Sequence, residues 1–100
     1  MTTRTNVTVE HDAPKHRFVA NVAGGQAELV YSQPDPKTID LQHTSVPAEA
    51  RGQHVAEALA STAFAYARQA GLRVIPTCPF VRQWLLRHPE QRDVILSGRG

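Results

Sequence analysis

Apolar and polar residues alternate in four stretches of the first half of the chain. A two-residue period is typical of strands that bury one face. The stretch 5–12 places Val7, Val9 and His11 on its inward side, and the stretch 17–22 places Phe18, Ala20 and Val22 there. The inward residues are Ala27, Leu29 and Tyr31 in the stretch 26–32, and Ile39, Leu41 and His43 in the stretch 38–46. We therefore predict an antiparallel meander followed by a fourth strand.

Turn-forming residues separate these stretches. Residues 13–16 are predicted to form a turn, and Gly24-Gly25 is a two-residue hairpin signal. Residues 33–36 (Gln-Pro-Asp-Pro) are expected to break the pattern, because two prolines so close together cannot sustain a strand ladder. Pro47 is expected to end the fourth strand.

The second half changes to a helical period. Residues 55–70 place apolar side chains on one wide, alanine-rich face, and Gly71 is a natural helix stop. A short buried strand is predicted at 72–76. A second helix is predicted at 80–88, with Phe80, Trp84 and Leu85 facing inward and Pro89 ending the helix. Residues 94–96 are a candidate last strand. The order of elements predicts an α/β (α+β) domain whose mixed, mainly antiparallel sheet contains at least one parallel pair, formed through the 55–70 crossover. We expect a single domain over 5–96, with flexible termini at 1–4 and 97–100.

Composition limits the classes of function. One hundred residues fit one domain, and 41% apolar with 20% charged residues is ordinary for a globular protein. The net charge is +2 and the arginines are scattered, so we expect no nucleic-acid partner. Cys78 is the single cysteine, no histidine pair has metal-ligand spacing, and no apolar run reaches membrane-spanning or signal length. These features predict no metal, no membrane association and a cytoplasmic location.

The segment Arg51-Gly52-Gln53-His54-Val55-Ala56 lies between a predicted strand and the long helix. Backbone N–H groups at a helix N-terminus have no partner within the helix and bind anions, so a pyrophosphate would fit here. A turn with an incidental glycine is the alternative interpretation.

This segment resembles the acyl-CoA pyrophosphate loop of the GNAT superfamily, which reads Gln or Arg, two residues, Gly, one residue, then Gly or Ala. Arg51 takes the first place and Ala56 the last, while His54 replaces the middle glycine and Gly52 lies close by. Glycine allows positive φ without a steric penalty, and histidine visits that region more often than most residues. The resemblance implies that acetyl-CoA is held by Ser45, Val46, Arg51, Gly52, Gln53, His54, Val55 and Ala56.

Further segments resemble the compact GNAT-like branch of this superfamily. They are His43-Thr44, the run from 74 to 81, and Arg87-His88-Pro89, so that the resemblance spans roughly residues 17 to 95. It implies a compact GNAT fold with a central CoA-binding helix, a second helix, and a sheet splayed between its fourth and fifth strands, where the acyl thioester is held. The branch lacks the helices that line the acceptor site in larger acetyltransferases, and the acceptor is therefore left open.

His43 and Cys78 are the candidate catalytic residues. Imidazole exchanges protons near neutral pH, which makes His43 the candidate general base, although a buried histidine satisfied by hydrogen bonds is an equal alternative. Cys78 precedes a helix, where it could act as a thiolate nucleophile or, protonated, as an acid, or could be an inert core residue. The resemblance implies that a backbone N–H near Ser45 or Val46 polarises the thioester carbonyl.

The function predicted on these grounds is an acetyl-CoA-dependent N-acetyltransferase. Its acceptor is an unspecified amine, a protein lysine among the possibilities, or a thiol, and its oligomeric state is not indicated. A CoA-binding GNAT-like module with little or no catalysis is the second hypothesis, and a scaffold that keeps only the fold is the third. Fold resemblance alone does not decide between them.

Overall fold

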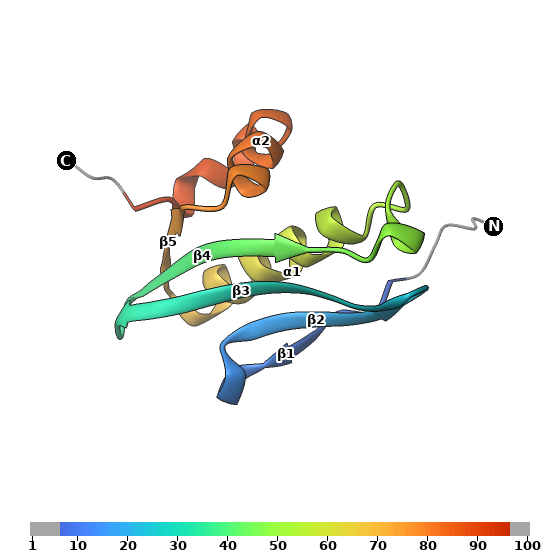
Figure 1. The fold of residues 1–100 in the computed structure, drawn as a ribbon. Helices are drawn as coiled ribbons and strands as arrows, with labels where there is room; N and C mark the ends of the chain where they lie inside the picture. The colour runs from blue at the N-terminus through green and yellow to red at the C-terminus, as the bar shows by residue number, and fades with distance from the viewer. Residues whose placement is uncertain (1–6, 97–100) are drawn as a thin grey trace.

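The computed structural model describes residues 7–96, and Figure 1 shows its strands and helices. The termini expected to be flexible, 1–4 and 97–100, lie outside the described residues, as do residues 5 and 6 of the first predicted strand. The elements are β1 (Glu10–Asp12), η1 (Ala13–Lys15), β2 (Arg17–Val22), β3 (Gly25–Asp35), β4 (Thr38–Ser45), η2 (Ala48–Ala50), α1 (Val55–Ala70), β5 (Arg73–Pro76), α2 (Pro79–Arg87) and η3 (Pro89–Val94), where η marks a 3-10 helix.

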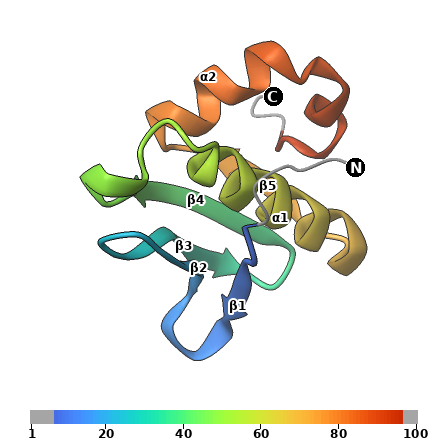
Figure 2. The same ribbon diagram turned by 90° about the vertical axis from the view of Figure 1, so that its right-hand side faces the viewer.

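The sheet has the strand order β1-β2-β3-β4-β5, the same as the order along the chain. The first four strands are antiparallel, and β4 and β5 are parallel because α1 carries the chain back across the sheet. Helix α1 lies against one face of the sheet, as Figure 2 shows. This arrangement confirms the predicted mixed, mainly antiparallel sheet with its crossover helix.

The hydrophobic core lies between the sheet and α1. Phe18, Leu29 and Leu41 of the sheet have no exposed surface, nor have Leu59 and Phe64 of α1. Helix α2 joins this core through Trp84, whose ring centroid lies 5.0 Å from that of Phe64.

Three predicted elements need little correction. Strand β2 and helix α1 have the predicted bounds, and α2 begins and ends one residue earlier than predicted. Gly71 ends α1 in the left-handed region at φ 73°, and the Leu72 N–H donates to the Ala67 carbonyl at 2.8 Å. This pairing satisfies a carbonyl that the helix end would otherwise leave free.

The turns around β3 differ from the prediction. The β2–β3 hairpin turns at Ala23-Gly24, because Gly25 already pairs with Val22. Strand β3 does not stop before Pro34 but continues to Asp35, since a register shift between Ser32 and Asp35 accommodates the proline. The turn that follows is closed by the Lys37 N–H, which donates to Asp35 Oδ1 at 2.8 Å.

A bulge in β4 corrects the predicted orientation of His43. Leu41 pairs with Tyr31 and His43 pairs with Val30, so Gln42 is an extra residue on β4. The extra residue shifts the alternation that follows it. His43 therefore does not share the buried side of Ile39 and Leu41 but is exposed, and the predicted inward phase was wrong.

The first and last predicted strands are shorter than expected. Strand β1 covers Glu10–Asp12 only, and the predicted strand at 94–96 is reduced to one parallel bridge between Ile95 and Val74. The preceding segment, η3, is tied to α1 by Arg68, whose Nη1 lies 2.7 Å from Asp93 Oδ2. Among residues 7–96, no helix is long and apolar enough to cross a membrane.

Candidate active site

The sheet opens where β5 ends. The parallel ladder between β4 and β5 stops at Leu41 and Pro76, and the Cys78 N–H makes one further bond of 2.8 Å to the Leu41 carbonyl. Beyond this point β4 continues to Ser45 beside β3, while the chain on its other side turns into α2. The two halves of the sheet therefore diverge at this point, leaving the end of β4 without a strand neighbour on the α2 side.

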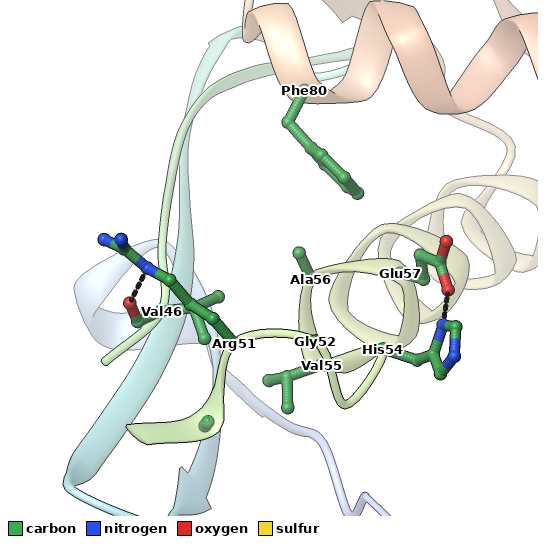
Figure 3. Close-up of a pocket in the computed structure, with 9 residues that line it drawn as sticks. Val46, Arg51, Gly52, His54, Val55, Ala56, Glu57 and Phe80 are labelled. Carbon is green, nitrogen blue, oxygen red and sulfur yellow. Dashed lines mark hydrogen bonds and ion pairs between the residues drawn. The ribbon is translucent and has the colours of Figure 1, made fainter. Parts of the chain in front are cut away.

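A cavity of about 300 Å³ lies beside this opening (Figure 3). It is lined by Val46, which follows β4, by residues of the loop before α1, by the first turn of α1, and by Phe80 of α2. The full set is Val46, Ala50, Arg51, Gly52, His54, Val55, Ala56, Glu57 and Phe80. The cavity thus brings together one stretch of the chain, residues 46–57, and Phe80, which lies much further along the sequence.

The loop that enters α1 has an unusual backbone. Gly52 has φ 84°, and His54, the residue before the helix, has φ 62° and ψ 26°. Within residues 7–96, the backbone N–H groups of Val55, Ala56 and Glu57 have no hydrogen-bond acceptor. Three free donors at the positive end of a helix dipole favour an anion at this position.

Glu57 introduces a negative charge beside the same donors. Its carboxylate accepts from His54 Nδ1 at 2.5 Å and lies 3.5 Å from Arg87 Nη1. Figure 3 shows the His54 imidazole turned toward Glu57 and away from Phe80. Arg87, and His54 when it is protonated, therefore offset the repulsion that Glu57 would exert on a bound anion.

Cys78 lies at the opening of the sheet and is only 3% exposed. It is the residue before α2, and its Sγ lies 3.3 Å from Oγ1 of Thr44 in β4. Thr44 pairs with the buried Leu29, which places the hydroxyl on the helix-covered side of the sheet. The Thr44 contact was missed by sequence reasoning, because it depends on the bulge at Gln42.

His43 and Cys78, the two predicted catalytic residues, are not brought together. His43 pairs with Val30 and is exposed on the other face of the sheet, whereas Cys78 is buried with Thr44. No hydrogen bond joins His43 and Cys78 in the part of the chain that is described. An imidazole and a thiol on opposite faces cannot form a directly paired base and nucleophile in this arrangement.

Six of the eight residues predicted to bind acetyl-CoA line the cavity, and Ser45 and Gln53 do not. Ser45 is the last residue of β4 and pairs with Glu28, while the Gln53 N–H donates to the Ala50 carbonyl at 3.4 Å. Phe80, which sequence periodicity assigned to the core, is half-buried and lines the cavity as well. Its position directly after Cys78-Pro79, at the start of a helix, is the signal that could have revealed it.

Comparison with protein families assigns the chain to one family. The sequence model of the GCN5-related N-acetyl-transferase family matches residues 17–94. The chain belongs to this family and is one of its small, GNAT-like members.

Individual proteins of similar length resemble the chain over most of their extent. Protein NATD1 of Danio rerio is 33% identical over 96 residues, which cover 92% of this chain and 87% of that protein. Protein NATD1 of Homo sapiens is 31% identical over 85 residues, or 83% of this chain and 75% of that protein. A GCN5-like protein from Staphylococcus aureus, solved by NMR, superposes with a TM-score of 0.71 at 26% identity and covers 93% of this chain and 91% of its own.

Proposed function

We propose that this protein is an acyltransferase that binds acetyl-CoA and transfers its acetyl group to an amine. The observation that carries the proposal is the set of three free N–H groups, on Val55, Ala56 and Glu57, at the edge of the cavity beside the splayed sheet. Membership of the GCN5-related N-acetyl-transferase family supports the same activity.

The residues of the cavity fit the coenzyme in chemical character. The left-handed loop at Gly52 and His54 leaves the first N–H groups of α1 free for a pyrophosphate. Val46 and Phe80, both half-buried, offer apolar surface for the less polar part of the coenzyme. Bound acetyl-CoA supplies an acetyl group activated as a thioester.

The chain's own groups have separate roles in the proposed transfer. The free edge of β4 beyond Leu41 offers backbone groups that can hold the carbonyl oxygen. Cys78, linked to Thr44, is the thiol at the opening and is suited to giving a proton to the leaving sulfur. His43 lies on the open face, so it serves as base only for an amine that approaches from that face. The acceptor amine loses one proton as its nitrogen replaces sulfur on the acetyl carbon.

A second candidate function is coenzyme binding with little catalysis. The separation of His43 from Cys78, together with the burial of the Cys78 thiol, favours this alternative. In either case we place the protein in the cytoplasm, where a reducing environment suits its single free thiol. We propose a small amine or a protein lysine as the acceptor, and neither a nucleic acid nor a membrane as a partner.

Thermal unfolding with and without acetyl-CoA tests the proposal. A ligand that binds only the native state adds about 2.7 kcal/mol to stability at a hundredfold excess over Kd, so the melting midpoint should rise. Free CoA should act nearly as well, because it carries the same pyrophosphate. An unchanged midpoint at millimolar acetyl-CoA in low-phosphate buffer contradicts coenzyme binding. Release of free thiol with an amine panel then separates the acyltransferase from the binding module.

A further inference from the structure

A second groove, of about 560 Å³, lies on the outer side of α2. Its apolar lining includes Pro76, Leu86 and Ile95, and Arg82 and Arg92 flank it. No residue is shared between this groove and the cavity of the candidate active site. The groove is therefore a separate feature of the surface, built from the last residue of β5, from α2 and from the segment that follows α2.

The groove carries apolar surface that packing within the chain does not explain. The inner side of α2 buries Val81, Trp84 and Leu85, whereas the Leu86 side chain is 70% exposed. Leu96, which directly follows Ile95, is 42% exposed. Among residues 7–96 these are the two large hydrophobic side chains that are exposed, so the exposed apolar surface is concentrated around one end of the molecule.

The two arginines at the groove have no acidic partner among the described residues. Arg82 Nη2 donates to the Thr77 carbonyl at 3.3 Å, and the Arg92 side chain makes no hydrogen bond or ion pair there. Arg17 and Arg68 do have acidic partners, Asp12 with Glu28 and Asp93 respectively. Arg51 and Arg73, like Arg82, donate to backbone carbonyls, but neither lines this groove. Guanidinium groups without a carboxylate partner, beside an exposed leucine, complement a ligand that presents carboxylates together with an apolar side chain.

We propose that this groove docks an acidic, amphipathic segment of another protein, with an apolar side chain against Leu86 and Ile95 and carboxylates on Arg82 and Arg92. A second copy of the chain fits less well, because a two-fold contact centred on Leu86 would bring like-charged arginines together. A nucleic acid lacks a stacking surface here, since Trp84 is only 5% exposed. The proposal stands independently of the proposed enzymatic activity.

An NMR titration of the ¹⁵N-labelled protein tests the docking surface. The probe is a synthetic helical peptide with leucines on one face and glutamates on the other, and the amides of Arg82, Leu86 and Ile95 should shift. A peptide with serine in place of leucine, and one with lysine in place of glutamate, should leave these amides unmoved. Raised ionic strength should weaken binding of the acidic peptide by screening its charge.

Surface variants identify which side chains contribute to binding of the acidic peptide. Arg82→Gln and Arg92→Gln should each raise the Kd of the acidic peptide about two- to fivefold, and Leu86→Ser about tenfold. Lys37→Gln, which removes an exposed charge on the β3–β4 turn, is the matched control and should leave the Kd unchanged. Unchanged melting midpoints show that the variants fold.

Several outcomes overturn the proposal. Absence of shifts with the acidic peptide at millimolar concentration does so, as does equal binding of the serine peptide. Acetyl-CoA that shifts the same amides and displaces the peptide assigns the groove to the coenzyme. A dimer lost in Leu86→Ser assigns it to a second copy, and shifts with a single-stranded oligonucleotide but not with peptide assign it to nucleic acid.

Discussion

Gly52 and Gly71 form a natural pair for testing the loop before α1. Their φ angles are 84° and 73°, and a Cβ added at either position would meet no atom within 4 Å. Alanine in the left-handed region costs roughly 1–2 kcal/mol, so both Gly52→Ala and Gly71→Ala should lower the melting midpoint. Only Gly52 lines the active-site cavity.

We expect Gly52→Ala alone to weaken acetyl-CoA binding, because the strained loop will move its N–H donors out of position. Isothermal titration calorimetry of both variants provides the measurement, with Gly71→Ala as the control for general destabilisation. Equal affinities in the two variants would show that the loop does not hold the pyrophosphate.

His11 is a half-buried imidazole away from the active-site cavity. Its ring stacks on Phe18 with centroids 4.5 Å apart, and its Nε2 lies 2.6 Å from the Tyr31 hydroxyl. Burial lowers the pKa of His11 below its ordinary value of 6.5; Asp12 partly opposes this shift, and His16 adds to it. The folded protein therefore takes up a proton at His11 less readily than the unfolded chain does.

Stability should fall at acid pH for this reason. The contribution of neutral His11 is fully present above pH 6.5 and is lost as the pH falls from that value toward the lower pKa of the folded state. In His11→Gln, which keeps a hydrogen-bonding group near Tyr31, the melting midpoint should fall less as the pH drops from about 7.5 to about 5. The same pH dependence in the variant and the parent protein would exclude His11 as the source.

At the scale of elements, the small side chains of α1 set its distance from the sheet. Ala60, Ala63 and Ala67 have no exposed surface, whereas Ala65 faces solvent. Ala63→Leu should lower the free energy of unfolding by about 1–3 kcal/mol, since a close-packed core cannot accept three more carbons without displacement. Ala65→Leu, with the same change in volume and helix propensity, should alter it by less than about 0.5 kcal/mol.

Denaturant unfolding measures both free energies. A loss in Ala65→Leu as large as that in Ala63→Leu would mean that volume at the α1–sheet contact is not the cause. A neutral Ala63→Leu would show that α1 can move away from the sheet at little cost.

The elements that were predicted best from the sequence are those in which the alternation of apolar and polar residues is not interrupted by an extra residue. Helix α1 repeats its apolar period from Val55 to Ala70, and its predicted bounds were correct. Strand β4 contains one extra residue, Gln42, that carries no composition signal of its own. The alternation after that residue is therefore reversed, and His43 was assigned to the wrong face.

In the candidate site too, the features set by local sequence could be predicted and those set by tertiary contacts could not. The loop before α1 could be found from sequence, because a motif of local residues determines both its backbone and its free N–H groups. The contact between Thr44 and Cys78 joins residues 34 positions apart and requires both the bulge and the parallel β4–β5 pairing. Such contacts depend on tertiary register, which periodicity does not specify.

At the scale of the whole molecule, the order of strands in the sheet has a kinetic consequence. Strands β1 to β4 are sequential neighbours and can pair by closing short turns, whereas β5 reaches β4 only after all of α1 has been placed. Closing a long segment before its contacts form carries a larger entropic penalty. We therefore expect the meander to form early in folding and the β4–β5 pairing, with the opening that houses Cys78, to form last.

Folding kinetics of two core variants can establish this sequence of events. Leu29 in β3 and Val74 in β5 are both fully buried, so Leu29→Ala and Val74→Ala each remove core contacts. Leu29→Ala should slow folding, with a φ-value of about 0.5 or more, while Val74→Ala should mainly speed unfolding, with a φ-value near zero. The reverse result would mean that the parallel pair nucleates the fold. If β5 does join last, it should also be released first, and the splayed edge of β4 would then open and close far more often than the molecule unfolds as a whole.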